Sequence, residues 1–120
     1  MEKYFCNYKQ ALALKELGFD EPCFGWYHPK GNIIYAITKD KDSIVNAPLK
    51  SQVFEWARKE HKIHGSYGTT SDSREEVNGY CISNFIDGNR NYLHINWEVG
   101  TYDEAESACI DKLIEILKMK

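Results

Sequence analysis

The feature that most constrains the fold is an alternation of apolar and polar residues from position 92 to position 99. Successive side chains of a strand point to opposite sides of a sheet, so this pattern predicts a strand with one dry face and one wet face. The expected dry positions are Leu93, Ile95, Trp97 and Val99, and the expected wet positions are Tyr92, His94, Asn96 and Glu98. Such a strand favours an antiparallel sheet that is covered by helices on one side only.

Three segments repeat their apolar residues at helical spacing: residues 7–17, 48–61 and 101–118. Asn7 can cap the first of them, and Pro48 suits the first turn of the second because its missing N–H needs no partner there. The third begins with the capping-box pair Thr101 and Glu104, and it places acidic residues at its start and lysines at its end. We expect an amphipathic helix in each segment.

Five segments are rich in β-branched and aromatic residues and are bounded by turn residues: residues 23–28, 32–38, 66–70, 77–86 and 92–99. The turns Pro29-Lys30-Gly31 and Asp87-Gly88-Asn89 indicate hairpins, and residues 39–43 form a charged connector. The expected order is α-β-β-α-β-β-β-α. We therefore expect a single α+β domain over residues 1–120, with two layers: a five-stranded, mostly antiparallel sheet and three helices on one face.

Composition limits the class of protein. The chain has 120 residues, of which 42% are hydrophobic and 28% are charged, as in an ordinary globular domain. No apolar run is long enough to span a bilayer, and the first six residues lack the apolar stretch of a signal peptide, so we expect a cytoplasmic protein without a membrane partner. The net charge of −3 argues against nucleic acid, which is bound mainly through clustered cations.

The usual chemical motifs are missing from the sequence. There is no Cys-x-x-Cys pair and no glycine-rich phosphate loop, and His61 and His64 stand three apart without a third ligand nearby. We therefore expect no metal and no cofactor. The cysteines are widely spaced and are expected to act as small core hydrophobes in a reducing compartment: Cys6, Cys23, Cys81 and Cys109.

The remaining signal is aromatic surface. More rings fall on the expected strands than one covered sheet face can bury, so some should lie on the open face, where rings with hydrogen-bonding tips are typical of binding surfaces. The open face could also be covered by loops or by a second copy in a homodimer. The candidate ligand-binding or partner-binding residues are Trp26, His28, Tyr67, Arg74, Tyr92, His94 and Asn96.

Residues 48–118 follow the order α-β-β-β-α, and in this respect the chain resembles a double-stranded-RNA-binding domain. The resemblance implies a shared topology. That family contacts phosphates with cations at the start of its last helix, whereas residues 102–106 here read YDEAE and would repel a phosphate. RNA binding is therefore not expected.

Three blocks resemble a set of small α+β proteins encoded by phages and prophages of gut bacteria. They are residues 11–23 (ALALKELGFDEPC), residues 47–49 with 52–56 (APL and QVFEW) and residues 101–105 (TYDEA) before a final amphipathic helix. The resemblance implies a small intracellular protein of viral origin. It does not assign a catalytic role to any residue of this chain.

Together these observations predict a non-catalytic binding protein that occludes a host macromolecule, as in host takeover or the blocking of host defence. The open sheet face and the loop over residues 68–76 would make the contact. An alternative is a protein that sequesters a small, nucleotide-like ligand, with Arg74 or Lys30 neutralising a phosphate. A third is an enzyme that uses Cys81 and His94, provided that their side chains meet.

Overall fold

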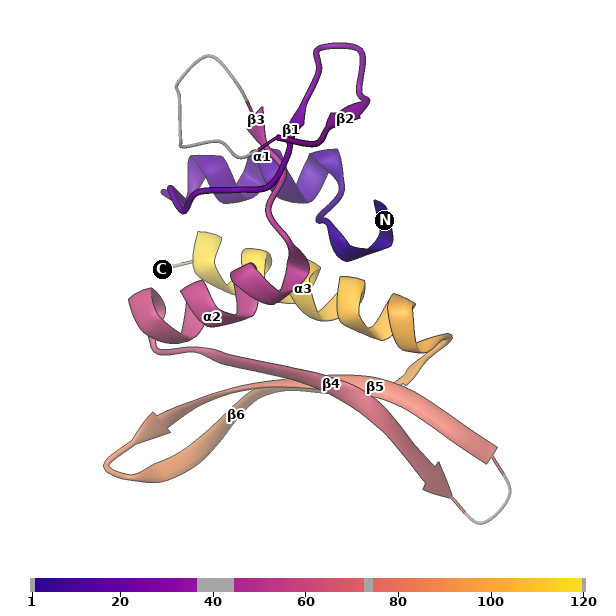
Figure 1. Ribbon diagram of the computed structural model, residues 1–120. Coiled ribbons are helices and arrows are strands. Elements are labelled where there is room, and N and C mark those ends of the chain that lie inside the picture. The colour runs from indigo at the N-terminus through magenta and orange to yellow at the C-terminus, as the bar shows by residue number, and fades with distance from the viewer. Residues whose placement is uncertain (1, 37–44, 73–74, 120) are drawn as a thin grey trace.

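The computed structural model describes residues 2–36, 45–72 and 75–119, and the charged connector expected at residues 39–43 lies outside these ranges. The described part of the chain forms four layers, with a small sheet, one helix, a pair of helices and a larger sheet following one another (Figure 1). The helices are η1 (Glu2–Tyr4), α1 (Tyr8–Glu16), α2 (Lys50–His61) and α3 (Tyr102–Lys118). The strands are β1 (Trp26–Tyr27), β2 (Ile33–Ile34), β3 (Val45–Asn46), β4 (His64–Asp72), β5 (Glu75–Ile86) and β6 (Asn89–Val99).

The larger sheet has the order β4-β5-β6 and is antiparallel throughout. Asp87 and Gly88 form the two-residue turn between β5 and β6 with φ values of 52° and 81°, the left-handed backbone that such a turn requires. Helices α2 and α3 cover one face of this sheet, and no described element covers the other (Figure 1). The α+β class, the antiparallel pairing and the α-β-β-β-α order of this part are as expected from the sequence.

The expectation of one five-stranded sheet with three helices on one face is wrong. The β1–β2 hairpin does form, but each strand has only two paired residues, and β1 pairs on its other side with β3 instead of with the larger sheet. Helix α1 lies between this small sheet and the α2–α3 layer (Figure 1). The physical reason is that α1 buries two sides, since Leu14 packs in the core of the larger sheet and Ala11 in that of the small sheet.

The helix boundaries follow the capping residues. The Thr101–Glu104 capping box is confirmed, and Asn7 caps α1 by accepting a hydrogen bond of 2.8 Å from the Gln10 N–H. Helix α2 begins at Lys50, two residues later than expected, because Pro48 is held outside it: its carbonyl accepts a hydrogen bond of 2.9 Å from the Cys6 N–H.

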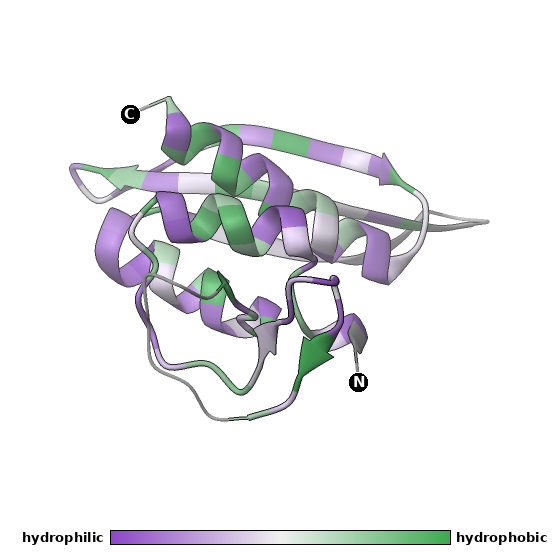
Figure 2. Ribbon diagram, turned by 90° about the horizontal axis from the view of Figure 1, so that it is seen from above, coloured by the Kyte–Doolittle hydropathy of each residue, from purple (hydrophilic) through white to green (hydrophobic). Residues whose placement is uncertain are grey.

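The buried side chains form two clusters. The first lies between the larger sheet and the three α-helices, and the second lies between η1, α1 and the small sheet and includes Phe5, Ala11, Tyr27 and Ala47. Seen from above, hydrophobic and hydrophilic bands alternate along the helices, as expected where one side of a helix is buried (Figure 2). None of the helices within the described ranges is both long and apolar enough to cross a membrane.

Candidate binding surface

The side of the larger sheet that faces away from the helices carries a row of exposed rings and aliphatic side chains. Residues that stand directly opposite each other in an antiparallel pair share a face. Ser66 pairs with Cys81 and Cys81 with Ile95, whereas the neighbouring Ile82 is fully buried on the helix side. Trp97 lies on the same outer side, because its ring stands against the position that a Cβ of Gly79 would occupy. We call this outer side the open face and define it by Ser66, Cys81, Phe85, Arg90, Tyr92, Ile95 and Trp97.

The large side chains of the open face are exposed to an unusual degree. The exposed fractions are 49% for Phe85, 54% for Tyr92, 49% for Ile95 and 41% for Trp97. Arg90 lies between two of the rings, with its guanidinium carbon 5.3 Å from the Phe85 ring centre and 5.9 Å from that of Tyr92. These cation–π contacts orient the rings without covering them.

The structure reverses the expected faces of residues 93–97 in β6, whereas Tyr92 and Glu98 are exposed and Val99 packs against the core as expected. Ile82 pairs with His94 and Tyr80 with Asn96, so both of these expected wet residues lie on the helix side and are half-buried. Leu93, Ile95 and Trp97, expected to be dry, are exposed. The pairing of β5 with β6 has two register irregularities, and each of them adds one residue to β6 relative to β5. Helix α3 lies mainly over β4 and β5, so the hydrophobic core extends little over β6.

Tyr80 is the buried neighbour of the two half-buried β6 residues. Its ring stacks on that of His94 with centres 5.6 Å apart. The pKa of the Tyr80 hydroxyl is raised, because the effect of burial exceeds the lowering by the hydrogen bond with Asn96. His94 and Asn96 therefore lie at the edge of the hydrophobic core, on the helix side of the sheet, and not on the open face.

Tyr67 also lies on the helix side. Its hydroxyl donates a hydrogen bond of 2.6 Å to Glu106 Oε2, and its ring contacts those of Phe54 and Tyr102. Burial and this hydrogen bond to a carboxylate raise the pKa of Tyr67 far above its usual value. The other oxygen of Glu106 lies 3.8 Å from the ammonium of Lys50, so the three side chains form a polar cluster between sheet and helices.

The other expected binding residues lie elsewhere. Trp26 and His28 belong to the small sheet and the turn that follows β1, beyond α1 from the larger sheet, and their ring centres are 6.4 Å apart. Arg74 lies outside the described residues. Of the six expected residues that the structure describes, only Tyr92 is placed on the open face, so the structure does not bring these six together.

Sequence analysis did not place Phe85, Arg90, Ile95 and Trp97 on the open face. For Phe85 and Arg90 a signal was present, because a two-residue turn at Asp87 and Gly88 fixes the pairing of the residues on either side of it and sets Phe85 opposite Arg90. For Ile95 no local signal exists, since its face depends on an irregularity that the residue types do not reveal.

The proposed Cys81–His94 pair does not form. Cys81 lies on the open face, where its sulfur is 3.1 Å from the Ser66 hydroxyl, and His94 lies on the helix side. The sheet therefore separates the two side chains. Among the residues that the structure describes, no three His, Cys, Asp or Glu side chains are grouped so that they could hold a metal ion.

The four thiols differ in how far they are buried. Burial raises the pKa of Cys6 and of Cys109 to about 12, and Cys23 is also buried, whereas Cys81 is half-buried. We expect Ellman's reagent at about pH 8 to modify Cys81 first and the other three slower by roughly a hundredfold or more, because the thiolate is the reacting species. The variant Cys81→Ser should lose the fast phase. A fast phase that persists in this variant would contradict the described burial.

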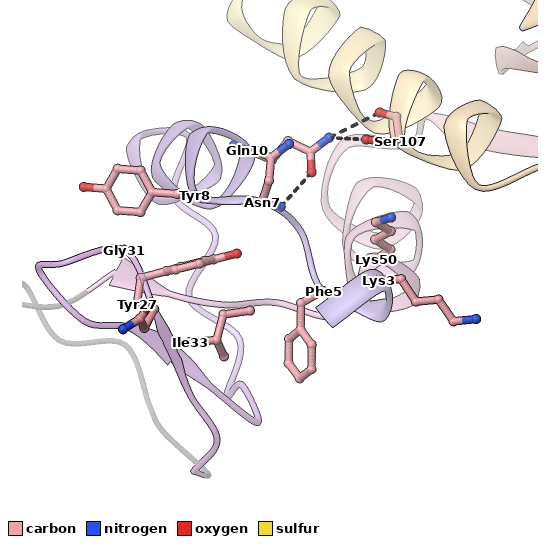
Figure 3. Close-up of a pocket in the computed structure, with 11 residues that line it drawn as sticks. Lys3, Phe5, Asn7, Tyr8, Gln10, Tyr27, Gly31, Ile33, Lys50 and Ser107 are labelled. Carbon is pink, nitrogen blue, oxygen red and sulfur yellow. Dashed lines mark hydrogen bonds between the residues drawn. The ribbon is translucent and has the colours of Figure 1, made fainter. Parts of the chain in front are cut away.

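A cavity of about 560 Å³ lies on the far side of the helices from the open face. It is open to solvent and is bordered by η1, the start of α1, the β1–β2 hairpin and the start of α2, with Ser107 of α3 at one side (Figure 3). The Gln10 amide nitrogen donates to the Ser107 hydroxyl (3.1 Å) and to Asp111 Oδ1 (2.9 Å), which fixes the helices that form the walls.

Comparison with known proteins gives no match: no family model, no curated protein and no solved structure is similar to this chain at a significant level. The open face and the cavity are therefore interpreted from their own geometry.

Proposed function

We propose that this chain is a non-catalytic, phage-derived binding protein that occludes the surface of a host protein with its open face. The observation that carries the proposal is the row of four large apolar side chains on one uncovered side of the sheet: Phe85, Tyr92, Ile95 and Trp97. Viral origin rests on the resemblance of three sequence blocks to proteins of phages and prophages.

The chemistry of the open face fits a protein partner. Tyrosine, tryptophan and arginine supply most of the binding energy in protein interfaces, and here Tyr92, Trp97 and Arg90 stand on one strand, β6. The net charge of −3 favours a protein over a nucleic acid. A contact of about 800 Å² per partner is enough for a stable complex, and blocking a surface needs no assembled catalytic group.

The test is capture of a partner from a lysate of a gut bacterium with the immobilised chain, followed by binding measurements with the purified partner. The double variant Ile95→Ser/Trp97→Ser should stay folded because neither side chain belongs to the buried core, and it should weaken binding by about thirtyfold or more. The control variant Leu12→Ser/Met119→Ser removes two exposed apolar side chains elsewhere and should bind normally.

Three outcomes would overturn the proposal. In the first, the partner binds the open-face double variant as well as it binds the original chain. In the second, no lysate protein is retained above the level seen with the double variant. In the third, sedimentation shows a dimer that the double variant dissociates, which would mean that a second copy covers the open face.

A further inference from the structure

Strand β4 forms one edge of the larger sheet (Figure 1). It pairs with β5 through nine consecutive residues, His64 to Asp72, without a register irregularity. Within the described ranges, no backbone hydrogen bond joins β4 to an element other than β5. The outward N–H and C=O groups of β4 therefore stand at even spacing without a backbone partner, and such an edge can pair with a further strand.

The residue types of β4 do not block such pairing. Proline, lysine and β-bulges are common means by which an edge strand is protected, and β4 has none of them. Gly68 stands at the centre of the strand, and a Cβ built there meets nothing within 4 Å. Helix α2 packs near the start of β4 but leaves an open hollow of about 240 Å³ beside His64 and Gly65. A second strand can therefore approach along this edge.

The two ends of β4 are flanked by opposite charges. Residues 58–62, just before the strand, hold three cations and one carboxylate, whereas residues 72–76, at its end, hold three carboxylates and one cation. Arg58 and Lys62 are exposed and form no ion pair with a described residue, and Arg58 borders the hollow at the start of β4. In an antiparallel pair of two β4 strands, the basic start of each strand would lie beside the acidic end of the other.

A second copy of the chain is the occupant that these features fit best. A two-fold axis at Gly68 sets two β4 strands antiparallel and matches both pairs of charged ends at once, whereas a foreign strand would match them only by chance. The resulting six-stranded sheet would have β6 at both of its outer edges. Because β6 has two register irregularities, the pairing should stop at two copies.

We infer that the chain forms a symmetric dimer through antiparallel pairing of β4 with β4 of a second copy, centred on Gly68. The open faces of the two copies then lie side by side on one sheet and stay uncovered, so the inference does not depend on the proposed function. Backbone hydrogen bonds contribute modestly and association costs entropy, so we expect a dissociation constant of about 10–100 μM.

The first experiment is sedimentation equilibrium of the whole chain from about 5 μM to about 1 mM, with hydrogen exchange measured at both concentrations. We expect a monomer–dimer equilibrium. At the higher concentration, exchange should slow for alternate amides of β4 and stay unchanged for those of β6. A chain that is monomeric at about 1 mM, or slower exchange in β6 instead of in β4, would overturn the inference.

Variants at the centre of the strand locate the interface. Gly68→Lys sets two ammonium groups against each other at the two-fold axis and should weaken the dimer by about tenfold or more, whereas Gly68→Ala should leave it intact. Both variants should stay folded, because a side chain at this position has open space. The open-face variant Ile95→Ser/Trp97→Ser should also keep the dimer. Loss of the dimer in this variant, or an unchanged dimer in Gly68→Lys, would refute β4 as the interface.

Charge reversal tests the register of the pair. Arg58→Glu/Lys62→Glu should weaken the dimer by about tenfold, because carboxylates would then stand near carboxylates at both ends. The control Lys9→Glu/Lys30→Glu changes the net charge by the same amount at exposed lysines on α1 and on the β1–β2 hairpin, and it should leave the dimer intact.

A compensating swap completes the test. Adding Glu75→Lys/Glu76→Lys to the variant Arg58→Glu/Lys62→Glu should restore most of the lost affinity, because opposite charges again meet across the pair. Failure of this swap to restore the dimer, or an equal loss in the control, would overturn the register centred on Gly68.

Discussion

Replacing Gly79 with alanine is expected to destabilise the chain by about 3 kcal/mol, which corresponds to a fall of about 10 °C in melting temperature. A Cβ atom at Gly79 would lie 2.4 Å from the Asn96 carbonyl oxygen and 2.5 Å from the Trp97 Cα. Both are backbone atoms of β6, so no side chain can rotate away, and the strand itself must shift at one of its register irregularities.

The matched control is Gly68→Ala, because Gly68 stands directly opposite Gly79 in the β4–β5 pair. A Cβ at Gly68 meets nothing within 4 Å, and its backbone is not in the left-handed region. Alanine there should be neutral or stabilise by about 0.5 kcal/mol, since it restricts the unfolded chain. Both free energies are measured by urea denaturation, and equal effects of the two substitutions would show that the crowding at Gly79 is not real.

Truncating Leu113 to alanine should cost about 3 kcal/mol. Leu113 is fully buried in the middle of α3 and belongs to the cluster that joins the helices to the larger sheet. Removing a buried isobutyl group loses its transfer free energy and leaves a cavity that the surrounding helices only partly fill.

Leu12→Ala in α1 is the control for helix propensity, because the chemical change is the same and the Leu12 side chain is 37% exposed. Its cost should stay below about 1 kcal/mol. Thermal and urea unfolding of both variants give the comparison. A Leu12 effect as large as that of Leu113 would place the core on a different side of α1.

Local signals in the sequence were sufficient to predict the three α-helices and the hairpin turns. Thr101 with Glu104 and Asn7 with Gln10 are capping pairs whose geometry is set by residues three apart, and the Asp87–Gly88 turn needs only its own backbone. Such features do not depend on the rest of the fold, and the structure has all three.

The pairing of β1 could not be predicted in the same way. Its aromatic residues indicate a strand, but its partner is decided by α1, which separates the small sheet from the larger one by burying residues on two sides. Strand β3 has only two residues, too few for a periodic signal. The number of sheets is therefore a property of packing at long range.

The sequence indicated the type of candidate site, an aromatic sheet surface, but not the residues that form it. The surplus of aromatic residues indicated an uncovered sheet face, and the larger sheet has a face that no described element covers, but its members differ from the expected ones. Alternation assigns a face to each residue of β6 only if the strand is regular, and two extra residues shift the faces of His94 and Ile95. The cavity depends on Lys3, Lys50 and Tyr27, which come from three distant segments and share no motif.

The irregularities of β6 have a consequence for how the chain behaves at high concentration. This strand is the border of its sheet, eleven residues long, with aliphatic and aromatic side chains in contact with water. A regular border of this kind is a template on which further chains add strand by strand into fibres. The two extra residues interrupt the even spacing of its outward N–H and C=O groups, so an incoming strand cannot pair along its full length. The same distortion that turns Ile95 outward thus also protects the chain against growth into aggregates.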